Sequence, residues 1–126
     1  PNGKIEKKSV ECKRISEFFN QNNIDKIDYL SIDIEGMDYS VLMKLNLKKF
    51  KIKNISFEHL HLTFWQKIKI VTKLINNDYF FSGMGFDLRK SDWMFTKNYQ
   101  YKKLQTFLLP ITPRRIWKRY QFSILK

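Results

Sequence analysis

The segment that most constrains the fold of this chain is Ile27–Asp38, an apolar run that ends in acidic residues and a glycine. Most positions of Ile27–Ile34 are apolar, which predicts a strand buried on both faces of a parallel sheet. The run then changes abruptly to Asp33, Glu35, Gly36 and Asp38. Because open α/β sheets bind ligands at the carboxyl ends of their strands, we expect a functional site at this turn.

Extended and helical patterns alternate upstream and downstream of this run. Lys4–Arg14 predicts a short strand or an extended segment, and Ser16 is a candidate N-cap for a short helix. Asp38 begins a second helix, where a carboxylate in the first turn suits the helix dipole. Asn54–Leu62 predicts the next strand, and its alternation places Ile55, Phe57, His59 and His61 on one side.

The second half of the chain continues the alternation. Thr63 and Gln66 form a capping-box pattern, and an apolar stripe at helical spacing follows. The stripe consists of Phe64, Ile68, Val71 and Ile75. Tyr79–Phe86 and Trp93–Lys97 predict an antiparallel hairpin. The order indicates an α/β fold whose sheet is mostly parallel and has a C-terminal antiparallel hairpin. We expect one domain over residues 1–97 and a basic C-terminal extension over residues 98–126.

The composition narrows the classes of function. The 126 residues carry a formal charge of +12, and no acidic residue follows Asp92, so the basic extension could contact an anionic membrane surface. Nucleic-acid binding is an alternative, but the aromatic residues fall within the apolar stripes, which argues against it. No apolar run is long enough to span a membrane. The single cysteine, Cys12, suits a reducing, cytoplasmic setting.

Ionisable side chains follow two strands that we expect to be neighbours. Asp33 and Glu35 end the first strand, and Glu58, His59 and His61 end the next. If the strands are parallel and adjacent, these groups form an acid–base pocket. The alternatives remain open, because either histidine alone could be a satisfied half-buried side chain. Two histidines spaced i, i+2 without further ligands are a weak zinc signal, so we predict no metal.

The remaining motifs give weaker evidence of function. Asp38 could be only a helix cap, and Gly36 could serve a positive φ or a close approach of the backbone. Asp87 lies in the turn of the predicted hairpin and Trp93 follows it, so both are candidates for substrate contacts. The pair Gly83 and Gly85 lacks the third glycine of a dinucleotide fingerprint.

These motifs together resemble the FkbM family of methyltransferases. The matching residues are Asp28-Tyr-Leu-Ser-Ile-Asp-Ile-Glu-Gly-Met-Asp38 and, at the expected distance, Ile55-Ser-Phe-Glu-His59. The resemblance covers roughly residues 8 to 97 and corresponds to the C-terminal half of the family domain. Ser31 stands where the family usually has lysine, and Asp38 stands where glutamate is common.

The resemblance implies a Rossmann-like class I fold and a transferase that uses S-adenosyl-L-methionine. It implies O-methylation of a hydroxyl on a sugar, glycan or secondary metabolite, by in-line displacement at the methyl sulfonium. The catalytic residues would be Asp33, Glu35, Glu58 and His59. Asp33 and Gly36 would also contact the cofactor, while His61, Asp87 and Trp93 would contact the acceptor, which is a small molecule or a glycan.

One part of the family pattern is missing from the sequence. The chain begins Pro1-Asn2-Gly3, and no glycine-rich turn of the kind that grips the cofactor precedes Asp33. We therefore expect a partial fold, a fragment without the main cofactor-binding half, which is inactive alone. The competing hypotheses are a basic nucleic-acid-binding module and a noncatalytic α/β module that binds an anionic membrane or a partner.

Overall fold

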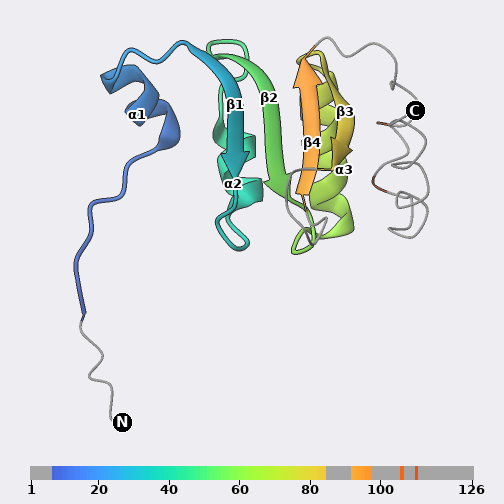
Figure 1. Cartoon of the computed structure of the whole chain (residues 1–126). Coiled ribbons are helices and arrows are strands. Elements are labelled where there is room, and N and C mark those ends of the chain that lie inside the picture. Colours follow the sequence, from blue (N-terminus) through green and yellow to red (C-terminus); the bar gives the residue numbers. More distant parts are fainter. Residues whose placement is uncertain (1–6, 85–91, 98–105, 107–109, 111–126) are drawn as a thin grey trace.

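The computed structural model describes residues 7–84, 92–97, 106 and 110 of the chain. Its centre is a four-stranded sheet in the order β1-β2-β4-β3. The strands are β1 (Lys26–Ile32), β2 (Lys51–Glu58), β3 (Tyr79–Met84) and β4 (Asp92–Lys97). The helices are α1 (Ile15–Gln21), α2 (Asp38–Lys44) and α3 (Phe64–Ile75). Figure 1 shows the four strands side by side, with α1 next to the β1 edge.

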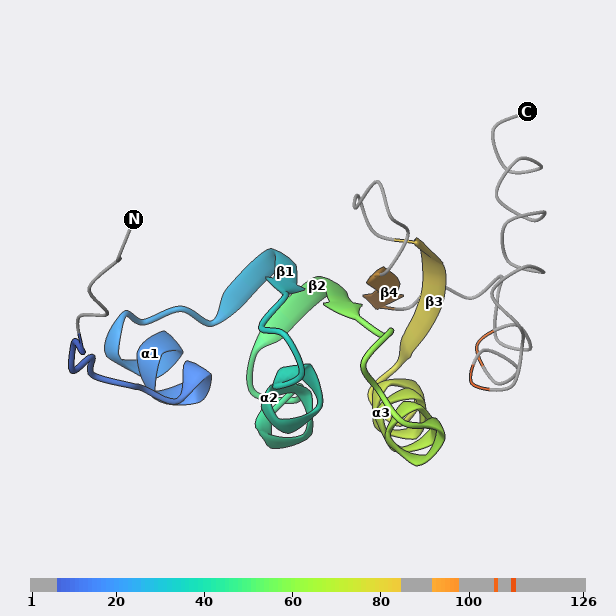
Figure 2. The same cartoon turned by 90° about the horizontal axis from the view of Figure 1, so that it is seen from below.

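Helices α2 and α3 cover the same face of the sheet, as the end-on view in Figure 2 shows. Helix α2 connects β1 to β2, which pair in parallel, and α3 follows β2. This β-α-β unit confirms the expected alternation around Ile27–Ile34. It also brings the carboxyl ends of β1 and β2 to the same edge of the sheet.

The described strands confirm the prediction of a mostly parallel sheet that includes an antiparallel strand. Among the described strands β1, β2 and β3 run in one direction, and β4 runs in the opposite direction because it pairs antiparallel with both β2 and β3. The predicted hairpin pairing of β3 with β4 is confirmed. The hairpin folds back so that β4 lies inside the sheet and β3 lies at its edge.

Aromatic side chains build the core between the sheet and its helices. Phe57 stacks on Phe95 with ring centroids 5.8 Å apart, and Phe81 meets Phe95 edge-on at 5.9 Å. Tyr79 is fully buried, and its hydroxyl donates a 2.6 Å hydrogen bond to the carbonyl of Ile52. Helix α3 contributes its buried residues Ile70, Val71 and Leu74 to the same core.

The N-terminal part confirms one predicted alternative and departs from the prediction in two ways. Residues 7–14 form no strand, so the extended alternative holds for them. Helix α1 begins one residue before Ser16; its N-cap is Arg14, which makes no side-chain capping bond. Strand β1 is not buried on both faces, because it lies at the sheet edge and only Ile32 within it is buried. An apolar run cannot distinguish a central strand from an edge strand.

Two sets of hydrogen bonds stabilise the ends of helices α3 and α2. At the start of α3 the backbone amide of Gln66 donates to Thr63 Oγ1 at 3.3 Å, and that of Thr63 donates to Gln66 Oε1 at 2.9 Å, which confirms the capping box. At the end of α2, Lys73 Nζ of α3 donates to the carbonyls of Leu42, Met43 and Leu45 at 2.7–2.8 Å. Carbonyls in the last turn of a helix have no amide donor within the helix, and Lys73 supplies donors to them here.

The predicted C-terminal extension lies almost entirely outside the described residues. Thr106 is an exception: it is fully buried, and its Oγ1 accepts a 2.8 Å hydrogen bond from the backbone amide of Phe81. This residue therefore packs against β3. No helix within the described ranges is long and apolar enough to cross a membrane.

Candidate functional site at the carboxyl edge of the sheet

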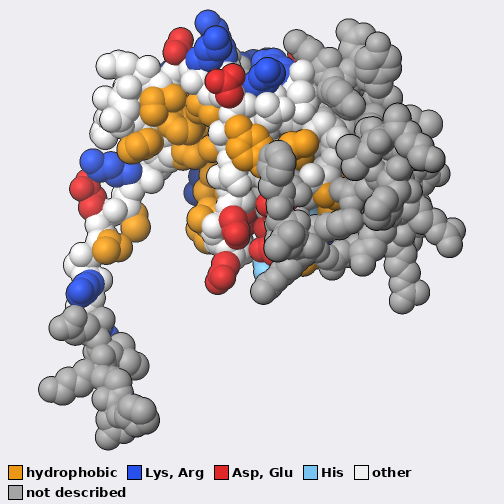
Figure 3. Space-filling model, in the orientation of Figure 1, with side chains coloured by type: hydrophobic (Ala, Val, Ile, Leu, Met, Phe, Trp, Pro, Cys, Tyr) orange, Lys and Arg blue, Asp and Glu red, His pale blue; other side chains and the backbone are white. Residues whose placement is uncertain are grey.

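The parallel register of β1 and β2 places two predicted site residues at the same edge. Ile32 pairs with Phe57, so Asp33 and Glu58 are the next residues along the two neighbouring strands. Glu35 follows in the turn after β1. We call Asp33, Glu35 and Glu58 the acidic edge. Figure 3 shows acidic side chains gathered at the lower end of the sheet, where β1 and β2 end, with a histidine beside them.

The turn between β1 and α2 has an unusual backbone. Glu35 has φ 39° and Gly36 has φ 95°, both in the left-handed region that costs energy for a residue with a Cβ. A Cβ built on Gly36 would have no atom within 4 Å, so Gly36 is present for its positive φ and not for a close approach. The open space beside Gly36 gives a ligand access to this turn.

The carboxylates at this turn differ in exposure. Asp33 and Glu35 are exposed. Asp38 is 1% exposed, and its Oδ1 has no hydrogen-bond partner within the part of the chain that the structure describes. It is the first residue of α2 and not its cap, since Met37 occupies the N-cap position. A buried carboxylate oxygen without a donor is costly.

Glu58 is the most enclosed member of the acidic edge. Its side chain is 15% exposed, and its Oε2 lies 3.3 Å from Nε2 of His61, whose side chain is 60% exposed. Asp92 of β4 lies directly opposite Glu58, and Asp92 Oδ2 accepts a 3.3 Å hydrogen bond from Ser56 Oγ. The antiparallel register of β2 and β4 thus places a second acidic residue next to Glu58.

His59 is held by an aromatic contact. It is 5% exposed, and its ring stacks on Trp93 with centroids 4.4 Å apart and planes 10° from parallel. Lys67 of α3 covers the same indole, with Nζ 5.8 Å from a ring centroid. Burial lowers the pKa of the Lys67 ammonium. This packing fixes the orientation of His59 at the end of β2.

The structure therefore brings together only some of the predicted site residues. His59 is buried and His61 is exposed, so the prediction that the alternation of β2 continues to His61 is wrong; the strand ends at Glu58. Trp93 is 4% exposed and supports His59, while its role in acceptor binding stays a prediction. Asp87 lies outside the described residues. Asp92 and Lys67 were not among the predicted site residues, because their places beside Glu58 and Trp93 depend on the pairing of β2 with β4.

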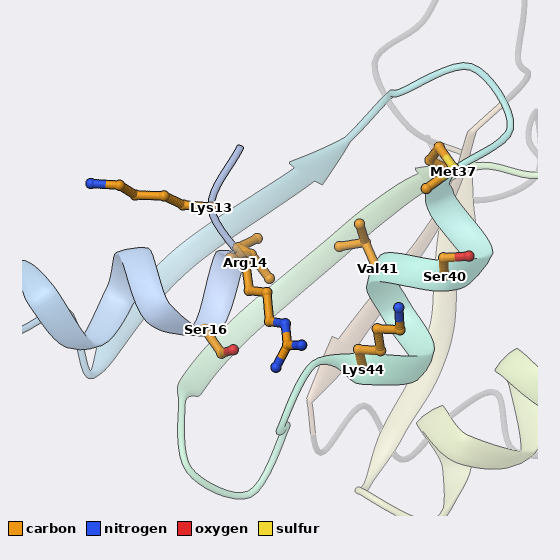
Figure 4. Close-up of a pocket in the computed structure, with 8 residues that line it drawn as sticks. Lys13, Arg14, Ser16, Met37, Ser40, Val41 and Lys44 are labelled. Atoms are coloured by element: carbon orange, nitrogen blue, oxygen red, sulfur yellow. The ribbon is translucent and has the colours of Figure 1, made fainter. Parts of the chain in front are cut away.

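A pocket of about 500 Å³ lies elsewhere, between α1 and α2 (Figure 4). Its lining includes Lys13, Arg14 and Lys44, the hydroxyls of Ser16 and Ser40, and the apolar residues Ile15, Met37 and Val41. None of the predicted site residues lines it. The acidic edge and this pocket are therefore separate features of the described structure.

An α/β sheet with carboxylates and an imidazole at the carboxyl ends of two parallel strands is typical of enzymes that bind a small ligand there. The family model described as the methyltransferase FkbM domain matches residues 3–102. The chain therefore belongs to the FkbM methyltransferase family and carries a methyltransferase domain. No curated relative and no solved structure matches it. Within the described residues no group of three or more His, Cys, Asp or Glu is placed to hold a metal ion.

Proposed function

We propose that this domain is an S-adenosylmethionine-dependent O-methyltransferase that acts on a hydroxyl of a sugar, glycan or secondary metabolite. Membership of the FkbM family supports methyl transfer. The observation that carries the assignment of the site is the parallel register of β1 and β2, which brings Asp33 and Glu58 to one edge of the sheet. General acid–base chemistry on a hydroxyl needs a carboxylate or imidazole within reach, and this edge offers both.

The turn after β1 suits the cofactor. S-Adenosylmethionine carries an ammonium group and ribose hydroxyls, which donate hydrogen bonds. Asp33 and Glu35 present exposed carboxylates to accept them, and the space beside Gly36 is open. When bound, the cofactor supplies an electrophilic methyl carbon. In this proposal Asp33, Glu35 and Gly36 hold the cofactor close to the carboxyl end of β2.

Glu58 is the proposed proton acceptor for the substrate hydroxyl. Its carboxylate lies at the end of β2 and is largely shielded from water. His61, 3.3 Å away, can share a proton with it, and the stacked His59 fixes one side of the acceptor position. Positioning of the hydroxyl and removal of its proton are the two contributions of these side chains.

We also propose that further strands complete the cofactor site. Among the described strands β1 pairs only with β2, so the other edge of β1 is available to pair with a further strand. On this basis the 126-residue chain alone is expected to bind S-adenosylmethionine weakly and to be inactive. Isothermal titration calorimetry tests this expectation, and tight binding to the isolated chain would overturn it.

The activity test uses the whole protein that carries this domain, radiolabelled S-adenosylmethionine and a panel of hydroxylated acceptors. Glu58→Gln removes the proton acceptor without changing its size, so we expect a loss of about 10²-fold or more in kcat. Glu17→Gln changes an exposed carboxylate on α1 and serves as the matched control. Full activity of Glu58→Gln, or equal losses in both variants, would refute the assignment.

A further inference from the structure

Exposed apolar side chains follow the two strands that end at the acidic edge. Eight large hydrophobic residues are exposed within the described ranges, and five of them follow β1 or β2 at the carboxyl edge. These five are Ile34, Met37, Leu60, Phe64 and Trp65. A contiguous apolar patch rimmed by polar residues marks a binding site, and adjacent exposed aromatic side chains form such a patch. This surface lies where the substrate of the proposed function would bind.

The two aromatic residues form a fixed pair at the start of α3. The ring centroids of Phe64 and Trp65 lie 5.4 Å apart, and the rings meet edge-on. Phe64 is 46% exposed and Trp65 is 69% exposed, although the helical pattern of the sequence had predicted Phe64 in the core. The capping box fixes the backbone just before them. The pair therefore lies at a defined backbone position and contributes little to the core.

The charges at this edge select the kind of ligand. Glu58 and His61 lie in the segment that leads into the aromatic pair, and Asp33 and Glu35 lie at the end of the neighbouring strand. Carboxylates accept hydrogen bonds from hydroxyls and repel anions. Aromatic faces contact apolar C–H surfaces. A ring with several hydroxyls and an apolar face, and without negative charge, satisfies both requirements.

We propose that Phe64 and Trp65 form a stacking platform for a neutral sugar ring, with Glu58 and His61 contacting its hydroxyls. This inference rests on the proposed function, because the bound sugar would be the acceptor of the methyl group. It narrows the acceptor from any hydroxyl compound to a neutral sugar. It also assigns recognition to two aromatic residues that were not among the predicted site residues.

The binding test needs no methyl transfer. Saturation-transfer-difference NMR on the whole protein uses methyl β-D-glucopyranoside and methyl α-D-mannopyranoside as probes. Trp65→Ala is expected to weaken glycoside binding about fivefold, and Trp65→Phe to retain most of it, because an aromatic contact contributes a factor of roughly 2 to 12. Phe18→Ala is the matched control, because Phe18 is 49% exposed on α1, away from the carboxyl edge.

Trp65 is mostly exposed, so its removal should leave the thermal transition unchanged, which a melting curve checks. Glycoside binding that is equal in wild type and Trp65→Ala, or absent from wild type for both probes, would overturn the proposal. So would Trp65-dependent binding to phosphatidylglycerol vesicles without glycoside binding, which would indicate a membrane contact.

The outcomes also separate this inference from the proposed function. If methyl is transferred to a sugar and Trp65→Ala leaves KM unchanged, the platform is wrong and the proposed function stands. If glycosides bind through Trp65 but no methyl is transferred to them, the sugar platform stands and the proposed function fails. A rise in KM for the sugar at unchanged kcat in Trp65→Ala supports both.

Discussion

The contact between Lys73 and the end of α2 gives the sharpest stability prediction. Its ammonium donates hydrogen bonds of 2.7–2.8 Å to three carbonyls at the C-terminus of α2. Lys73→Met keeps the apolar length of the side chain and removes all three bonds. The ammonium is partly withdrawn from water, and this burial lowers the pKa of Lys73.

The expected cost follows from these contacts. A buried carbonyl left without a donor costs about 1–3 kcal/mol, but water can reach part of this half-buried site. Loss of a cation at a helix C-terminus adds about 0.3–1 kcal/mol. We therefore expect Lys73→Met to lower the free energy of unfolding by about 3 kcal/mol, with a fall in Tm of roughly 10 °C.

Urea unfolding followed by circular dichroism measures this change. Lys69→Met is the control, because Lys69 is an exposed lysine on the same helix and makes no hydrogen bond in the described structure. A Lys73→Met midpoint within error of the Lys69→Met midpoint, at equal m-values, would refute the reasoning. It would mean that the three carbonyls are as well satisfied by water as by the ammonium.

Three further predictions concern single residues. Burial raises the pKa of Tyr79 to about 12. Because the tyrosine of the unfolded state loses its proton at lower pH than that of the folded state, the free energy of unfolding falls between about pH 10 and pH 12. Urea titrations across this range should show a loss of about 2–3 kcal/mol in wild type relative to Tyr79→Phe. Gly36→Ala should lower the free energy of unfolding by about 1 kcal/mol, because the φ of Gly36 is 95° and an alanine is strained there even though its Cβ would meet no other atom. Equal stability of the variant and wild type would mean that the turn relaxes to another conformation. Asp38→Asn should raise that free energy by about 1 kcal/mol in the same assay, because burial of an amide costs less than burial of a carboxylate whose Oδ1 has no donor, and this gain exceeds the loss of an acidic side chain at the start of α2; a fall in stability would contradict this explanation.

Local signals in the sequence predicted most of the elements. The capping box at Thr63 and Gln66 involves four consecutive residues, so the pattern alone was sufficient. The hairpin of β3 and β4 was predictable from two neighbouring strand patterns. The position of β4 inside the sheet was not, because it depends on which strand pairs with β2. The burial of β1 was mispredicted for the same reason.

The residues of the candidate site also divide into those that local sequence predicts and those whose positions depend on strand pairing. Asp33, Glu35 and Glu58 were predictable, because a parallel pair of strands brings its carboxyl ends together whatever surrounds it. Asp92 opposite Glu58 was not, because its place follows from the antiparallel register of β2 and β4. Nor was the exposure of Phe64 and Trp65: helical spacing predicts which residues share a face, but not where the buried face begins.

The contacts that stabilise α2 also bear on the chemistry. The helix is held at its C-terminus by Lys73 and begins directly after the turn of Glu35 and Gly36. Loss of the Lys73 contact would let α2 shift and would move that turn, while Glu58 stays fixed by the pairing of β2 with β4. The distance between the two sides of the acidic edge would then change. A misplacement of about 1 Å can cost roughly 10²-fold in rate, so Lys73→Met should reduce methyl transfer even at temperatures where the protein stays folded.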